Sequence, residues 1–144
     1  MTKQEMFTKV WLGLAGQNWK RSTEPSADDD HDDPRCCYRG PDGLKCAAGH
    51  LIPDEKYERK FEFFNIRNLL EKDPLLLGFE IPANSRNDIV SFLTRMQSAH
   101  DLHYVIGFAS NANGDREKFQ FDNMKDTFAK LAEIHNLQIP EEKS

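Results

Sequence analysis

The chain has 144 residues, the size of one ordinary domain, with 38% hydrophobic residues and a net charge of -5 at pH 7. This acidic balance excludes the usual nucleic-acid binder, which needs a basic face to displace phosphate counterions. No stretch approaches the roughly 20 apolar residues that cross a bilayer, and the N-terminus lacks the pattern of an export signal. We therefore expect one domain over residues 1–144, with no membrane or nucleic-acid partner, in the cytoplasm, where its three cysteines stay reduced.

The first predicted element is a helix over residues 3–16. Thr2 and Glu5 have the spacing of a capping box, in which each side chain accepts a hydrogen bond from the other residue's backbone. Apolar residues then recur at helical spacing. The segment 20–35 differs, because it contains two prolines and five aspartates, and we expect it to be an acidic, mobile loop.

A β-hairpin is predicted over residues 36–46. The sequence Gly40-Pro41-Asp42-Gly43 suits a tight turn, and short strands are expected on either side, at 36–39 and 44–46. A short helix over 46–52 follows and ends before Pro53.

Three longer helices complete the chain. The first covers 54–72 and is closed by Asp73 and Pro74, and the apolar run 75–81 is either a strand or a buried connector. The second begins after Ser85 and places Ile89, Leu93, Met96, His100 and His103 on one stripe.

The last helix runs from about Phe121 to His135, and Asn136 ends it in the left-handed conformation. Residues 141–144 are expected to fray. With four main helices and one short hairpin, the predicted fold class is α+β and mostly helical.

One stretch of the chain resembles a loose family of small, uncharacterised proteins from bacteria and their phages. The matching positions are Cys37, Tyr38, Arg39, Gly43, Lys45, Cys46, Ala47, Gly49, Leu51, Ile52, Pro53 and Asp54, followed later by Gln97, His100 and Asp101. The resemblance covers 36–57 well and 89–101 loosely, and it marks 104–118 as an insertion. It implies a fold and no activity, and it suggests by analogy a phage or mobile-element protein that acts on a host defence protein in the bacterial cytoplasm.

Cysteine and histidine side chains gather in that stretch, and zinc accepts both as ligands. Cys46 and His50 are four residues apart and would share a helix face, while Cys37 would come from the neighbouring strand. A fourth ligand would be one of Cys36, His31, His100 or His103. The spacing lacks the Cys-x-x-Cys pair typical of structural zinc, so no cofactor is expected and zinc stays an alternative.

A cysteine nucleophile is the second chemical reading. Cys46 at a helix N-terminus would be a stabilised thiolate, with His50 or His100 as the base and Asp101 near in sequence. Adjacent helical residues diverge by about 100°, so Asp101 is not expected to orient the His100 imidazole unless the helix frays there.

The third reading is packing. Cys46 would be small because the helix passes close to the hairpin, and His100 would be an ordinary core histidine. Tyr38 and Arg39 on the hairpin are candidate partner-binding residues. We therefore expect a non-enzymatic interaction protein with a protein partner, and we keep the cysteine hydrolase and the zinc-stabilised binding domain as alternatives.

Overall fold

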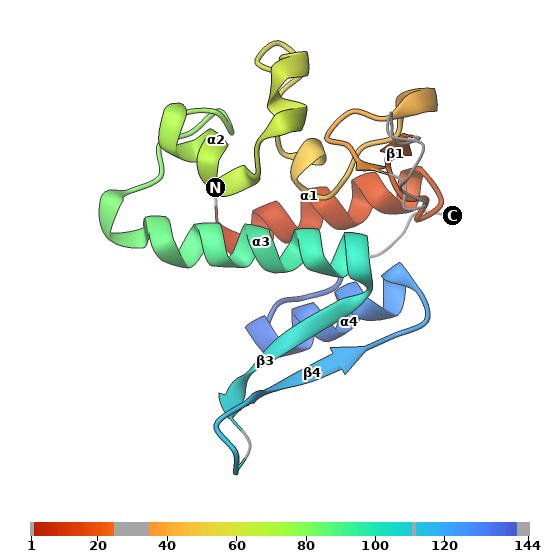
Figure 1. The fold of residues 1–144 in the computed structure, drawn as a ribbon, viewed down its shortest axis with the longest axis vertical. Helices are drawn as coiled ribbons and strands as arrows, with labels where there is room; N and C mark the ends of the chain where they lie inside the picture. The colour runs from red at the N-terminus through yellow and green to blue at the C-terminus, as the bar shows by residue number, and fades with distance from the viewer. Residues whose placement is uncertain (1, 25–34, 111, 141–144) are drawn as a thin grey trace.

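The structure is a computed structural model that describes residues 2–24, 35–110 and 112–140. Within these ranges the chain forms four α-helices and two separate two-stranded antiparallel sheets, joined by loops and 3₁₀ turns (Figure 1). This confirms the predicted class, a mostly helical α+β fold with four helices. None of the helices in the described ranges combines the length and apolarity needed to cross a bilayer.

Helix α1 (Lys3–Gly16) begins and ends as predicted. Thr2 accepts a hydrogen bond from the Glu5 backbone, and the Glu5 side chain accepts one from the Thr2 backbone, which completes the capping box. The helix buries Met6, Phe7, Val10, Trp11 and Leu14. Beyond its C-terminus, Trp19 packs on Trp11 with 4.7 Å between the ring centroids, and the planes are nearly perpendicular at 80°.

The predicted hairpin at 36–46 is wrong. Strand β2 (Arg35–Cys36) pairs with β1 (Thr23–Glu24), and residues 41–43 form a 3₁₀ turn, η1 (Pro41–Gly43). The turn itself exists, since the Gly40 N–H donates to the Leu44 carbonyl at 2.8 Å. No ladder extends from it, because the N–H groups on either side donate to side chains instead. Those of Tyr38 and Arg39 bond to Glu62, and that of Lys45 bonds to Gln17. The acidic loop predicted at 20–35 lies mostly outside the described residues, as does the frayed tail.

The predicted helix over 54–72 is two elements. A 3₁₀ helix, η3 (Arg59–Phe63), precedes helix α2 (Ile66–Lys72), and Phe64 between them has an extended backbone. The break has a local cause, because the Asn65 side chain accepts from the Asn68 N–H and so starts a new helix. Likewise, the short helix predicted at 46–52 is a 3₁₀ turn, η2 (Ala48–His50), and the run 75–81 is a connector without a strand.

Helix α3 (Arg86–Leu102) crosses the middle of the molecule (Figure 1). A turn η4 (Ala83–Ser85) leads into it, and His103 ends it in the left-handed conformation with a φ of 57°. The predicted insertion at 104–118 contains most of an unpredicted hairpin, β3 (Tyr104–Ser110) and β4 (Arg116–Gln120), in which Tyr104 lies opposite Gln120.

Helix α4 (Met124–His135) closes the described fold. Asn123 caps its start, and Asn136 ends it in the left-handed conformation with a φ of 55°, as predicted. Phe128 of α4 contacts Phe7 of α1 at 6.4 Å between ring centroids, so the first and last helices pack together.

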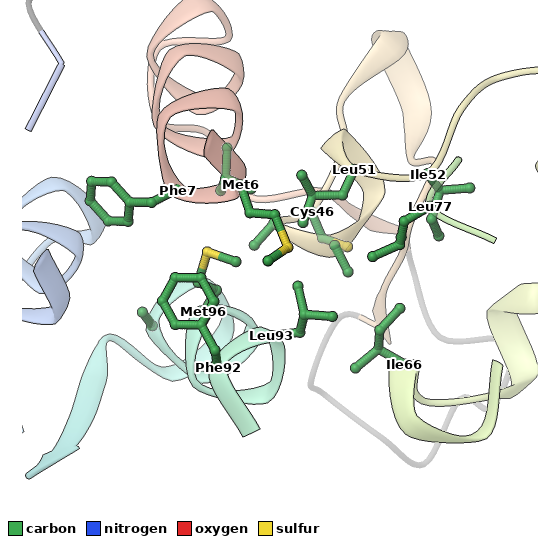
Figure 2. Close-up of a cluster of buried hydrophobic side chains, with 14 of the residues drawn as sticks. Met6, Phe7, Cys46, Leu51, Ile52, Ile66, Leu77, Phe92, Leu93 and Met96 are labelled. Carbon is green, nitrogen blue, oxygen red and sulfur yellow. The ribbon is translucent and has the colours of Figure 1, made fainter. Parts of the chain in front are cut away.

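One apolar cluster unites these elements. Figure 2 shows side chains from α1, α2, α3 and the loops meeting in it, and the labelled members are Met6, Phe7, Cys46, Leu51, Ile52, Ile66, Leu77, Phe92, Leu93 and Met96. Cys46 is therefore a core residue as well as a candidate site residue.

Candidate functional site

A hollow of about 450 Å³, here called the polar pocket, gathers much of the predicted constellation. Four of its lining residues are candidate site residues from the sequence: Cys37, Tyr38, Cys46 and Asp101. The segment before and into α2 adds Glu62, Asn65 and Arg67, and α3 adds Thr94 and Gln97. The loop from Cys37 to Cys46 thus faces α3 across a polar space.

Cys46 is buried as a thiol. Its side chain is 1% exposed, and this burial raises the pKa to about 12, even though the Gly49 N–H donates to its Sγ at 3.3 Å and works in the opposite direction. Asp101 raises the pKa further. The expected stabilisation of a thiolate by a helix N-terminus is present as this one hydrogen bond. The loss of solvation on burial has the larger effect on the pKa, so the sulfur is protonated at neutral pH.

His50 is in the same turn as Cys46 but lies outside the polar pocket. Its Nε2 is 3.0 Å from Gln17 Oε1, and its ring packs so closely on Gly13 of α1 that a Cβ there would lie 2.4 Å from Nδ1. Burial lowers the pKa of His50 to about 4, and the positive charge of Lys45 adds to this. The imidazole is therefore neutral and is used to dock the turn on α1.

His100 and Asp101 are in direct contact, which corrects the expectation from helical geometry. His100 Nδ1 lies 2.7 Å from Asp101 Oδ1, at the C-terminal end of α3, where the helix gives way to the left-handed His103. The His100 side chain is fully buried, and its Nε2 has no hydrogen-bond partner among the residues that the structure describes. Asp101 lines the polar pocket, whereas His100 lies in the core behind it.

The predicted zinc ligands are not brought together. Within the described ranges, no group of three or more His, Cys, Asp or Glu is arranged to hold a metal ion. Cys37 and Cys46 line the polar pocket while His50 lies against α1. Of the fourth-ligand candidates, His31 lies outside the described residues, as does the side chain of Cys36.

The proposed partner-binding residues, Tyr38 and Arg39, are engaged inside the domain. Tyr38 is 7% exposed and its hydroxyl donates to the Phe64 carbonyl at 2.7 Å. The Arg39 guanidinium donates to the carbonyls of Gly49 and Ile52 at 2.6 and 2.7 Å, and it also bonds to an Asp54 carboxylate oxygen at 2.9 Å. Both side chains therefore hold the loop that forms one wall of the polar pocket.

Glu62 is the residue that sequence reasoning missed. Its carboxylate accepts hydrogen bonds from the backbone N–H groups of Tyr38 and Arg39, at 2.9 and 3.1 Å, and from the Tyr57 hydroxyl. It thus replaces the partner strand that the predicted hairpin would have supplied. In the sequence, Glu62 is the single acidic residue within the aromatic run from Phe61 to Phe64. An acid among residues expected to pack in the core needs hydrogen-bond donors, and this could have indicated its role.

A second hollow, here called the aromatic groove, adjoins the polar pocket and measures about 740 Å³. Its apolar lining is Phe61, Phe63, Phe64, Leu69 and Leu76, and its charged rim is Lys56, Glu58, Lys60, Lys72 and Asp73. Phe63 and Phe64 line both hollows. The side chain of Phe63 is 75% exposed, although most large apolar side chains in the described ranges are buried.

Comparisons with known proteins add no relative. No family model matches the chain, and no similar protein was found among curated proteins or solved structures. The resemblance to small bacterial and phage proteins therefore stays an expectation from the sequence.

Proposed function

We propose that this is a non-enzymatic interaction protein that binds an extended or helical segment of a partner protein in the aromatic groove. The observation that carries the proposal is Phe63, whose ring is 75% exposed at the edge of an apolar hollow. A single exposed apolar residue is ordinary, but an exposed aromatic beside a lined groove is typical of interaction sites.

The groove offers apolar area that a partner can bury. Fully burying one phenylalanine side chain stabilises a complex by about 1.5–3 kcal/mol, and central aromatic residues dominate many interfaces. Phe61 and Phe64 form the groove wall beside Phe63, so a partner side chain inserted there would contact several rings.

The rim selects the charge of the partner. Three lysines against two acids leave a local excess of positive charge in a chain whose net charge is -5. The Lys72 ammonium lies 3.4 Å from the centroid of the Phe64 ring, and Lys56 donates to the Leu75 carbonyl, so two of the charges are held at the edge of the groove. A segment that combines apolar with acidic side chains complements this surface.

The polar pocket supports the non-enzymatic reading over the cysteine hydrolase. A hydrolase needs a thiolate beside a base, whereas the pKa of Cys46 is raised to about 12 and His50 lies against α1. The resemblance to phage and bacterial proteins extends the proposal to a host protein, including a defence protein, as the partner.

A peptide-display selection tests the proposal. Random peptides selected on the immobilised protein should become enriched in aromatic or aliphatic residues flanked by Asp or Glu. Phe63→Ser should weaken the binding of selected peptides at least about tenfold, the cost of losing a central aromatic contact.

The matched control is Leu102→Ser, because Leu102 is also an exposed apolar residue, at 56%, but lies at the end of α3 and outside the groove. This variant should bind the selected peptides as the wild type does. The proposal fails if no sequence class is enriched, or if the Phe63 variant binds the selected peptides unchanged.

A further inference from the structure

A third hollow lies between α2, α3 and the β3–β4 hairpin and measures about 340 Å³. We call it the arginine pocket, because its walls include Arg67, Arg95 and Arg116. Each arginine comes from a different element, namely α2, α3 and β4. Three arginines from separate elements therefore line one small space in a chain whose net charge is -5.

No carboxylate is among the described residues that line this pocket. Asp88, which lies outside this lining, acts electrostatically on Arg95 and also forms an ion pair with Lys3 at 2.8 Å. The residues of the pocket wall itself therefore carry a net positive charge. An anion placed among them would gain from all three arginines.

Arg95 is held in position from behind. Its Nη1 lies 3.3 Å from Nε2 of His135 on α4. Burial lowers the pKa of His135 to about 4, and the charge of Arg95 adds to this, so the imidazole is neutral at physiological pH and accepts the hydrogen bond. Burial also lowers the pKa of Arg95, and the charge of Arg116 contributes, which indicates that these two like charges are close enough to repel.

Hydroxyl groups complete the wall. Ser91, Arg95 and Ser98 are spaced four and three residues apart on α3, so they share one face of the helix. Tyr104 on β3 adds a phenol. Guanidinium and hydroxyl donors around a small space are the combination that proteins use for tetrahedral oxyanions.

We propose that the arginine pocket binds the phosphate group of a phosphate monoester. A monoester is close to a dianion at pH 7 and presents three acceptor oxygens, which matches a pocket lined by three arginines better than a carboxylate does. The rest of the ligand can extend into the polar pocket, because Arg67 lines both hollows and they adjoin there. The site is distinct from the aromatic groove.

Calorimetric titration with inorganic phosphate tests the site first. Binding should be saturable, and Arg116→Gln and Arg67→Gln should each weaken it at least about tenfold, the cost of losing a charged hydrogen-bond donor. Both arginines are exposed, so these variants should keep the fold, which circular dichroism would verify. Arg59→Gln is the matched control, because it removes the same charge from an exposed position outside the pocket and should bind phosphate as the wild type does.

Two further arms identify the carrier of the phosphate. Tighter binding of a phosphoserine peptide than of a sugar phosphate assigns the site to a modified protein, and the reverse order assigns it to a small metabolite. Either order supports the site. The proposal is overturned if phosphate binding is not saturable, if Arg59→Gln weakens it equally, or if an oligonucleotide without a terminal phosphate binds more tightly than any monoester. Phe63→Ser should bind phosphate normally, so the groove and this pocket can fail separately.

Discussion

Glu62 connects the loop of Cys37–Cys46 to the segment that forms the aromatic groove. Its two carboxylate oxygens accept from two consecutive backbone N–H groups, those of Tyr38 and Arg39. Tyr38 lines the polar pocket and Arg39 follows it in the same loop, and without the carboxylate both N–H groups would lose this acceptor. A single side chain thus does locally what a neighbouring strand does in a sheet.

We predict that Glu62→Ala lowers the free energy of unfolding by about 2–3 kcal/mol, because two partly buried donors lose a charged acceptor. Glu62→Gln should cost less, since the amide keeps one acceptor oxygen. Urea denaturation measures both. The control is Glu58→Ala, which removes an exposed ion pair with Lys60 and should change the free energy by less than about 1 kcal/mol. Equal losses for the two alanine variants would contradict the role given to Glu62.

At the level of elements, helices α3 and α4 differ in the capping of their N-termini, and a second prediction follows from this difference. The Asn123 side chain accepts from the Asp126 N–H at 2.8 Å and so caps α4, whereas Ser85 precedes α3 without a capping hydrogen bond from its side chain. Asn123→Ala should therefore lower the free energy of unfolding by about 1 kcal/mol. Ser85→Ala should be close to neutral in the same urea experiment, although serine and asparagine are both favoured N-cap residues. If Ser85→Ala lowered the free energy of unfolding as much as Asn123→Ala, the side-chain capping hydrogen bond of Asn123 would not be the cause of the loss.

The helices could be predicted where their signals are local. The Thr2–Glu5 capping box and the left-handed Asn136 lie within a few residues of the elements they end, and both are found as expected. Strand pairing depends on distant residues, and that is where the prediction failed. No local pattern near Arg35 predicts that β2 pairs with Thr23 and Glu24. No local pattern in 104–120 was recognised as the longer hairpin either.

The site was predictable in part for the same reason. Cys37, Cys46 and Asp101 do line one pocket, because the loop and α3 bring them there. His50 shares a turn with Cys46, but that turn is 3₁₀ and its histidine docks on Gly13, a contact that sequence spacing cannot reveal. Glu62 and the three arginines of the arginine pocket are isolated in the sequence and meet their partners only through the fold.

For the molecule as a whole, stability should depend on pH at both ends of the range. Burial lowers the pKa values of His50 and His135 to about 4, whereas in an unfolded chain each lies near 6.5. Between these values the unfolded state binds more protons, so the free energy of unfolding is fully retained above pH 6.5 and falls as the pH drops toward 4. On the alkaline side, Cys46 has a pKa raised from 9.0 to about 12, so stability should fall as the pH rises from about 9 toward 12.

Urea denaturation at a series of pH values between 4.5 and 10 measures this profile. His135→Gln should flatten part of the acid limb, because one of the histidines with a lowered pKa is then absent, while the alkaline limb stays unchanged. A free energy of unfolding that is constant between pH 6.5 and 4.5 would contradict the burial of the two imidazoles.

The contact between Trp11 and Trp19 decides what an optical experiment on this protein reports. These are the only two tryptophans of the chain, and their rings touch at the end of α1, beside Phe128 of α4. Excitation energy passes readily between indoles in contact, so their emission is one signal from one place. Fluorescence will therefore follow the separation of the first helix from the last, whereas far-ultraviolet circular dichroism follows all the helices together. Coincidence of the two unfolding curves would mean that this contact and the rest of the domain melt as a single cooperative unit.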